Sequence, residues 1–175
     1  MAKHKPIKML SADLYRIGEN VQSTALLSQA ASIVQQAAQA KARGRYTTGE
    51  LANSIGITID QQEYGTVAHI GTNKEYAIYV ELGTGPKGQA SHEGISPDVT
   101  PTYRQTPWWI HESQVNPKAA ETYKWFYIDT KDGRFYKVTG QPARPFLYPA
   151  INNNRARIEK ALNGSFEQAV SKATK

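Results

Sequence analysis

The sequence has no cysteine among its 175 residues, which excludes several kinds of chemistry at once. Without a thiol the chain holds no disulfide scaffold, thiolate zinc site, iron–sulfur cluster or cysteine nucleophile. Long apolar runs are lacking as well. The longest charge-free stretch, residues 20–40, contains five glutamines and is too polar to span a bilayer. The basic start lacks the apolar core of a secretory signal, so we expect synthesis in a reducing cytoplasm.

The remaining composition is that of an ordinary globular protein. Hydrophobic residues make up 39% and charged residues 21% of the chain. The length suits one good-sized core, so we predict a single domain over residues 1–175. Within it we expect a basic tail at residues 1–10 and an insertion at residues 86–140.

The net charge of +6 is unevenly distributed along the chain. Residues 1–46 carry +5, residues 47–85 carry −4, residues 86–140 carry +1 and residues 141–175 carry +4. Two basic ends therefore flank an acidic middle. Such a pattern suits head-to-tail contact between copies of one chain as well as contact with a polyanion.

From Ser11 to about Ala42, apolar residues recur at helical spacing, and the Ala and Gln content favours a helix that ends near Gly44. At about 1.5 Å per residue this helix is about 45–50 Å long, more than a domain of this size requires. It therefore either packs along the chain's own sheet or extends in part to a neighbouring molecule.

Alternation with a period of two then predicts two antiparallel strands, at residues 54–60 and 63–71. Apolar residues alternate in the same way over residues 76–85, which predicts a further strand, with a short helix as the alternative. The glycines and proline at positions 83, 85, 86 and 88 are expected to end any regular element.

Residues 86–140 hold nine of the 17 aromatic residues, which indicates a satellite core or a contact surface. Residues 88–106 are rich in Gly, Pro, Ser and Thr and are predicted to form an exposed loop. Residues 124–140 are predicted to form an aromatic-rich hairpin whose turn contains Lys131, Asp132 and Gly133.

After prolines at positions 142, 145 and 149, apolar residues at helical spacing predict a C-terminal helix. Arg155, Arg157 and Lys160 are expected to lie away from its apolar face. The predicted fold class is α+β. A long N-terminal helix and a C-terminal helix pack on a small antiparallel β-sheet, and the aromatic-rich β-hairpin is inserted between them.

Catalytic and metal-binding patterns are missing from the sequence. His92 and His111 precede glutamates but lack the second histidine of a zinc-protease helix, and residues 83–88 lack phosphate-loop spacing. We therefore expect no enzyme, no metal and no cofactor. The aromatic and basic residues around Trp108, Trp109, Trp125 and Arg134 are suited to stacking single-stranded bases, but interspersed acidic residues favour a protein–protein surface or a satellite core.

Four motifs in a fixed order carry a resemblance to a known family. They are Thr48-Gly49-x-Leu51-x-x-Ser54-Ile55, Ile70-Gly71-Thr72, Tyr76-Ala77-x-Tyr79-Val80-Glu81-x-Gly83-Thr84-Gly85 and Arg144-Pro145-Phe146-Leu147-x-Pro149-Ala150. With this order the chain resembles the neck or tail-completion proteins of long-tailed bacteriophages, minor tail components of the gene-product-ten type. The resemblance covers residues 11–85 and 142–175, and residues 86–140 depart from it.

The resemblance implies a structural virion protein of the neck that forms a ring of six copies, joins the head connector to the tail and lets DNA pass through its lumen. Its implied partners are further copies of itself, a head-closure or connector protein, a tail terminator or tail tube protein, passing DNA and no membrane. The interface candidates are Tyr76, Tyr79, Glu81, Gly83, Thr84, Trp108, Trp109, Trp125, Arg155 and Arg157.

Two other functions are compatible with the sequence. Basic termini are also typical of a DNA-binding module, here one of the phage packaging or host-takeover machinery. A hydrolase that uses His69 or His111 with a carboxylate would require those side chains to converge in one pocket.

Overall fold

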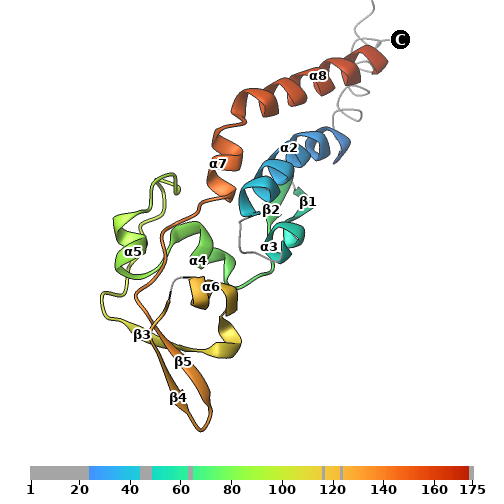
Figure 1. Ribbon diagram of the computed structural model, residues 1–175. Coiled ribbons are helices and arrows are strands. Elements are labelled where there is room, and N and C mark those ends of the chain that lie inside the picture. The colour runs from blue at the N-terminus through green and yellow to red at the C-terminus, as the bar shows by residue number, and fades with distance from the viewer. Residues whose placement is uncertain (1–23, 44–48, 63–64, 116, 123, 174–175) are drawn as a thin grey trace, which may run out of the picture. The chain divides into compact units, whose positions relative to one another are not determined.

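A computed structural model describes residues 24–43, 49–62, 65–115, 117–122 and 124–173, and Figure 1 traces the elements. The chain divides into two compact units, each built from separate stretches of sequence. The first unit comprises the described parts of residues 1–36, 56–71 and 151–175, and the second those of residues 37–55 and 72–150. The prediction of a single domain stays a prediction.

Helix α2 (Thr24–Ala42) confirms the C-terminal part of the predicted long helix. The predicted part from Ser11 to Ser23 lies outside the described residues. The buried side chains of α2 recur at helical spacing and are small: Ala30, Ala31, Val34, Ala38 and Ala42. Small side chains on one face let a helix approach its neighbours closely, and Figure 1 shows α2 beside strands β1 (Gly56–Gln62) and β2 (Gly65–Gly71).

The two predicted strands are confirmed as β1 and β2, which form an antiparallel pair with Gly56 opposite Gly71 and Ile59 opposite Ala68. Apolar residues of β1 alternate with exposed Thr58 and Asp60, as expected of a half-buried strand.

A short helix, α3 (Glu50–Ser54), precedes β1. The sequence pattern did not predict it. Gly49 begins it with a φ of 78°, and Leu51, Ala52 and the following Ile55 are buried. Gln39 of α2 donates to the Ile55 carbonyl at 3.3 Å, and Lys74 donates to Glu50, which raises the pKa of Lys74. Residues 50–55 are thus held at both ends, at Glu50 by Lys74 and at Ile55 by Gln39.

Within residues 76–85, residues 77–82 form a helix, so the preferred strand interpretation was wrong and the helical alternative is confirmed. In helix α4 (Ala77–Leu82) only Ala77 is buried. A second helix, α5 (Gly85–Ala90), follows it where no regular element was expected. Pro86 suits the first turn of α5 because the missing N–H would be unpaired there anyway. Gly88 lets the ring of Tyr103 lie against the helix, and the Tyr103 hydroxyl donates to the Leu82 carbonyl at 2.8 Å.

The insertion contains a three-stranded antiparallel sheet rather than a hairpin alone. The predicted hairpin is confirmed as β4 (Tyr127–Thr130) and β5 (Gly133–Val138). Strand β3 (Trp108–His111), which the sequence did not reveal, pairs with the other side of β5 and gives the order β3-β5-β4. A 3-10 turn η1 (Glu112–Gln114) and helix α6 (Pro117–Thr122) connect β3 to β4, while residues 91–107 lack regular structure, as expected of a loop.

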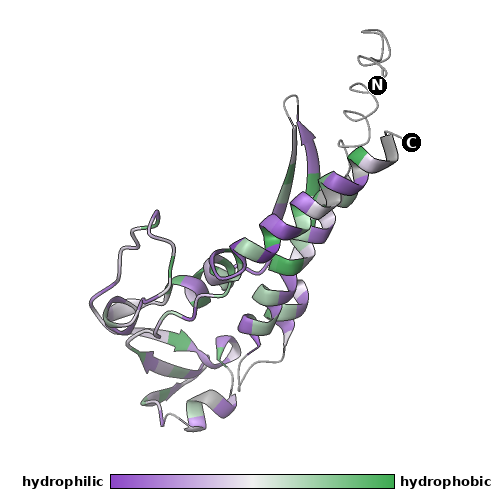
Figure 2. Cartoon of the chain, turned by 90° about the horizontal axis from the view of Figure 1, so that it is seen from above, coloured by the Kyte–Doolittle hydropathy of each residue, from purple (hydrophilic) through white to green (hydrophobic). Residues whose placement is uncertain are grey.

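The C-terminal region forms two helices, α7 (Leu147–Asn152) and α8 (Arg155–Ala173), where one was predicted. Together with two small antiparallel sheets, the helices confirm the α+β class. In Figure 2, hydrophobic and hydrophilic residues both occur along α8, as expected of an amphipathic helix. Among the described residues, no helix is both long and apolar enough to cross a membrane.

Replacing Gly164 in the middle of α8 by alanine is expected to stabilise this helix by about 0.5–1 kcal/mol. A Cβ at this position meets nothing within 4 Å, so only the backbone entropy changes. Amide hydrogen exchange of α8 should slow by about two- to fivefold. Unchanged or faster exchange would contradict the prediction.

Candidate assembly surfaces

The two C-terminal family motifs are joined by one carboxylate. Glu81 of α4 accepts hydrogen bonds from the backbone N–H groups of Phe146 at 2.6 Å, Leu147 at 3.0 Å and Tyr148 at 3.1 Å. These amides begin α7, where N–H groups lack partners within the helix and the helix dipole favours a negative charge. The Arg144 N–H also donates to the Val80 carbonyl at 2.8 Å. We call this arrangement the Glu81 clasp.

A close backbone crossing lies beside the Glu81 clasp. Thr84 and Gln141 exchange two backbone hydrogen bonds, of 2.9 and 3.0 Å. A Cβ on Gly140 would lie 1.9 Å from the Thr84 carbonyl oxygen, and one on Gly85 would lie 2.5 Å from the Thr139 oxygen. Residues 83–85 thus let two backbone segments pass close to each other. Gly83 and Thr84 therefore have a structural use within the chain.

The outer side of α4 is apolar and exposed. Ile78 is 55% and Tyr79 56% exposed, and Tyr76 lies beside them, whereas Ala77 on the other side is buried. We call Tyr76, Ile78 and Tyr79 the α4 patch. Tyr76 and Tyr79 were candidates from the sequence, but Ile78 was missed. Helical rather than strand spacing over residues 75–82 would have placed it with the two tyrosines.

The sheet of the insertion carries aromatic side chains on both faces. Residues directly opposite in antiparallel strands share a face, so Trp109 lies with Lys137 and Ile128. The ring centroids of Trp109 and the 65% exposed Phe126 are 6.0 Å apart. Phe126 was not a candidate, although it lies within the aromatic run.

The remaining candidate tryptophans of the insertion are half-buried. Trp108 packs beside Gly85, with the Arg104 guanidinium 5.6 Å from its ring centroid. Trp125 meets Tyr136 edge-on at 6.2 Å. The structure thus uses both rings in packing within the second unit, and Trp109 is the most exposed of the three.

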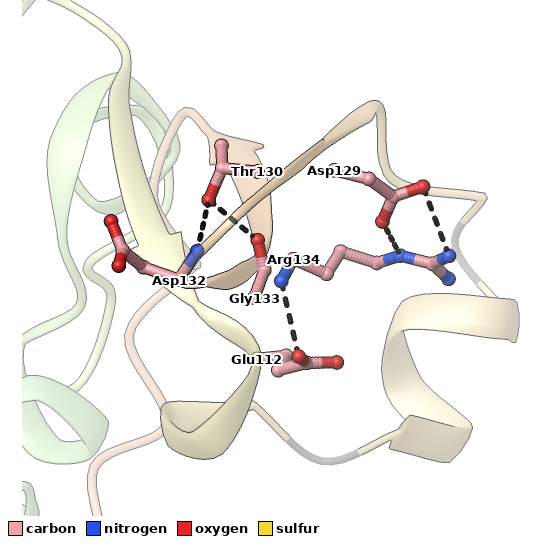
Figure 3. Close-up of polar contacts among 6 residues, drawn as sticks. All are labelled: Glu112, Asp129, Thr130, Asp132, Gly133 and Arg134. Atoms are coloured by element: carbon pink, nitrogen blue, oxygen red, sulfur yellow. Dashed lines mark hydrogen bonds and ion pairs between the residues drawn. The ribbon is translucent and has the colours of Figure 1, made fainter.

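Polar contacts fix the tip of the β4–β5 hairpin, as Figure 3 shows. Arg134 donates to both oxygens of Asp129, at 2.7 and 3.4 Å, and this interaction raises the pKa of Arg134. The Arg134 N–H donates to Glu112 at 3.0 Å, and the Thr130 hydroxyl donates to the Gly133 carbonyl at 2.8 Å. Exposed contacts of this kind add little stability, but together they hold the hairpin in one geometry.

Helix α8 presents a line of apolar side chains, Ile158, Leu162, Phe166 and Val170, which we call the α8 stripe. Phe166 is 49% and Leu162 37% exposed. The expectation that Arg155 lies away from this face was wrong. Arg155 opens α8 and precedes Ile158 by three residues and Leu162 by seven, so it shares their side of the helix.

Arg157 projects from the other side of α8 and donates to Asn154 at 3.1 Å.

His69 and His111, the two histidines of the hydrolase alternative, each make local polar contacts. His69 is 3.4 Å from Asp60 of the neighbouring strand, and both side chains are more than half exposed. His111 contacts the Ser113 hydroxyl at 2.8 Å and the Asp132 carbonyl at 3.0 Å. Within the described ranges, no group of three or more His, Cys, Asp or Glu side chains is placed to hold a metal ion.

Most candidate residues belong to one neighbourhood in the second unit. Glu81, Gly83 and Thr84 contact the backbone of residues 139–148. Tyr76 and Tyr79, at the start of α4 and within it, are exposed. Exposed apolar side chains of this kind are typical of the class of proteins that assemble with others.

Comparison with known families agrees with this class. The family model described as bacteriophage HK97-gp10, putative tail-component, matches residues 16–83. The match confirms the resemblance noted in the sequence over residues 16–83, and the family it matches is described as a tail component, that is, a structural part of a virion. No curated protein and no solved structure matches the chain. The matched segment ends at Gly83, and Glu81 within it holds the motif at residues 144–150.

Proposed function

We propose that the protein forms a ring at the phage neck that joins the head connector to the tail and lets DNA pass through its lumen. The observation that carries this proposal is the match of residues 16–83 to the tail-component family. The ring has six copies and acts by its geometry, without catalysis. Its neighbours are a head-closure or connector protein on one side and a tail terminator or tail tube protein on the other.

The distribution of charge and of exposed apolar side chains supports assembly. The basic residues 141–175 of one copy suit the acidic residues 47–85 of the next, because opposite charges favour a heterologous contact. The α4 patch and the α8 stripe supply apolar area that a monomer would leave in water. Aromatic residues of the insertion, Trp109 among them, are further candidates for contacts within the neck.

The mass of the purified protein and its position in virions test this proposal. Size-exclusion chromatography with light scattering is expected to give a multiple of the 19.4 kDa chain, and cryo-electron microscopy of virions to place the protein at the neck. A strict monomer that is absent from purified particles would contradict the proposal. Binding to short DNA duplexes is expected to be weak. Tight binding that falls steeply with salt would favour the DNA-binding alternative instead.

A further inference from the structure

Two apolar surfaces in the described parts of the chain differ in shape and carry opposite charges. The α4 patch is a short surface, and Glu75 lies in the turn that leads into α4, next to Tyr76 of the patch. The α8 stripe is a long, narrow ridge that begins at Arg155. Glu75 and Arg155 are exposed, and neither has a hydrogen bond or ion pair with any described residue.

The position of Arg155 is unfavourable for α8 itself. The first turn of this helix holds no acidic residue but contains Arg155 and Arg157. A helix N-terminus carries a partial positive charge, so cations there are repelled rather than stabilised. An acidic group from outside the helix would remove that repulsion. The α8 stripe therefore suits a partner surface that is apolar with a carboxylate at one side.

We propose that the α8 stripe of one copy docks on the α4 patch of the next copy, with Arg155 facing Glu75. The contact rests on the ring proposed above and identifies the surfaces that build it. Leu162 and Phe166 would cover Ile78 and Tyr79, and the ion pair would lie at the edge of the buried area. Because the two surfaces are different, each copy offers one of each to its two neighbours, so the contact can repeat from copy to copy as a ring requires.

Pairing of like surfaces is less favourable. Two α4 patches paired in parallel would bring Glu75 against Glu75, and two parallel α8 stripes would bring Arg155 against Arg155; in both cases the like charges repel each other. An antiparallel pair of stripes avoids that repulsion but leaves the α4 patch in water. The heterologous contact covers both surfaces and neutralises both charges.

Mixing two variants tests the contact. Ile78→Asp removes the α4 patch and Phe166→Asp removes the α8 stripe, and each variant alone is expected to be monomeric by light scattering. An equimolar mixture is expected to form a one-to-one heterodimer and nothing larger, since only one intact patch meets one intact stripe. Gln168→Asp, an exposed change on the opposite side of α8, is the control and should keep the wild-type mass. Circular dichroism checks that all variants are folded.

A charge exchange tests the ion pair separately. Glu75→Arg alone and Arg155→Glu alone are each expected to weaken self-association by about tenfold or more, because like charges then meet. The double variant carries the pair in reverse and should recover most of the lost affinity. Failure of the double variant to exceed either single variant would overturn the placement of Arg155 against Glu75.

Other outcomes of the mixing experiment would overturn this contact without contradicting the proposal that the protein forms a ring. If Ile78→Asp keeps the wild-type mass and Phe166→Asp is monomeric, the stripes pair with each other. If Phe166→Asp lowers the melting temperature without a change in mass, the stripe packs within its own chain and the contact is overturned. A wild type that is monomeric at high micromolar concentration also overturns the contact. The neck proposal itself fails only if the protein is also absent from virions.

Discussion

Replacing Gly140 by alanine is expected to destabilise the second unit by about 3 kcal/mol or more. The new Cβ would lie 1.9 Å from the Thr84 carbonyl oxygen and 2.9 Å from the Gly85 Cα, and the backbone φ of +95° is itself unfavourable for alanine. All nearby atoms belong to backbone, so no side chain can move aside. The paired hydrogen bonds between Thr84 and Gln141 would separate, and the urea midpoint should fall strongly.

Gly94→Ala is the matched control for this prediction. Gly94 also has a positive φ, of +79°, but its Cβ would meet only the ring of Pro145, at 3.4 Å. Gly94→Ala should lower the free energy of unfolding by about 1 kcal/mol, the effect of the backbone conformation alone. If Gly140→Ala is no more destabilising than Gly94→Ala, the close crossing does not contribute as described.

Glu81→Ala is expected to lower the free energy of unfolding by about 2–4 kcal/mol. The change removes the acceptor of three N–H groups at the start of α7, which are partly buried and have no helical partner there. Glu81→Gln keeps an acceptor oxygen but loses the charge, so about half of the loss is expected. Urea unfolding followed by circular dichroism measures both effects.

Glu75→Ala provides the control on the neighbouring turn. Its carboxylate is exposed and bonds to no described residue, so the free energy of unfolding should change by about 0.5 kcal/mol or less. Equal effects of Glu75→Ala and Glu81→Ala would contradict the role given to the Glu81 clasp. A Glu81→Ala variant that stays folded but no longer assembles would instead favour the interface role predicted for Glu81 from the sequence.

Local patterns were sufficient where an element depends on its own residues. The hairpin turn at Lys131, Asp132 and Gly133 was predicted because glycine takes the required positive φ, observed as 116° at Gly133. The strands β1 and β2 followed from alternation, and the described part of α2 followed from its Ala and Gln content. In each case the residues that determine the element lie within it or in the next element along the chain.

Elements held by distant partners were not predictable in the same way. Residues 76–85 alternate like a strand, yet they form α4, in which Glu81 reaches amides 65 to 67 residues further along the chain. Strand β3 has four residues and depends on pairing with β5. Tertiary contacts can override a local preference of about 1 kcal/mol or less per residue, and no local pattern reports on them.

The sequence by itself determined that the protein is a cysteine-free chain with basic ends, an acidic middle, the local patterns of an α+β fold and a segment similar to a phage tail-component family, because composition and motif order are properties of the chain alone. Only the tertiary structure decided how those motifs are used. It turned Glu81, Gly83 and Thr84 inward, because backbone amides and carbonyls from residues 139–148 lie against them. It left Ile78, Tyr79 and Phe166 exposed, because in the described part of the chain the helices that carry them turn these side chains away from the buried residues.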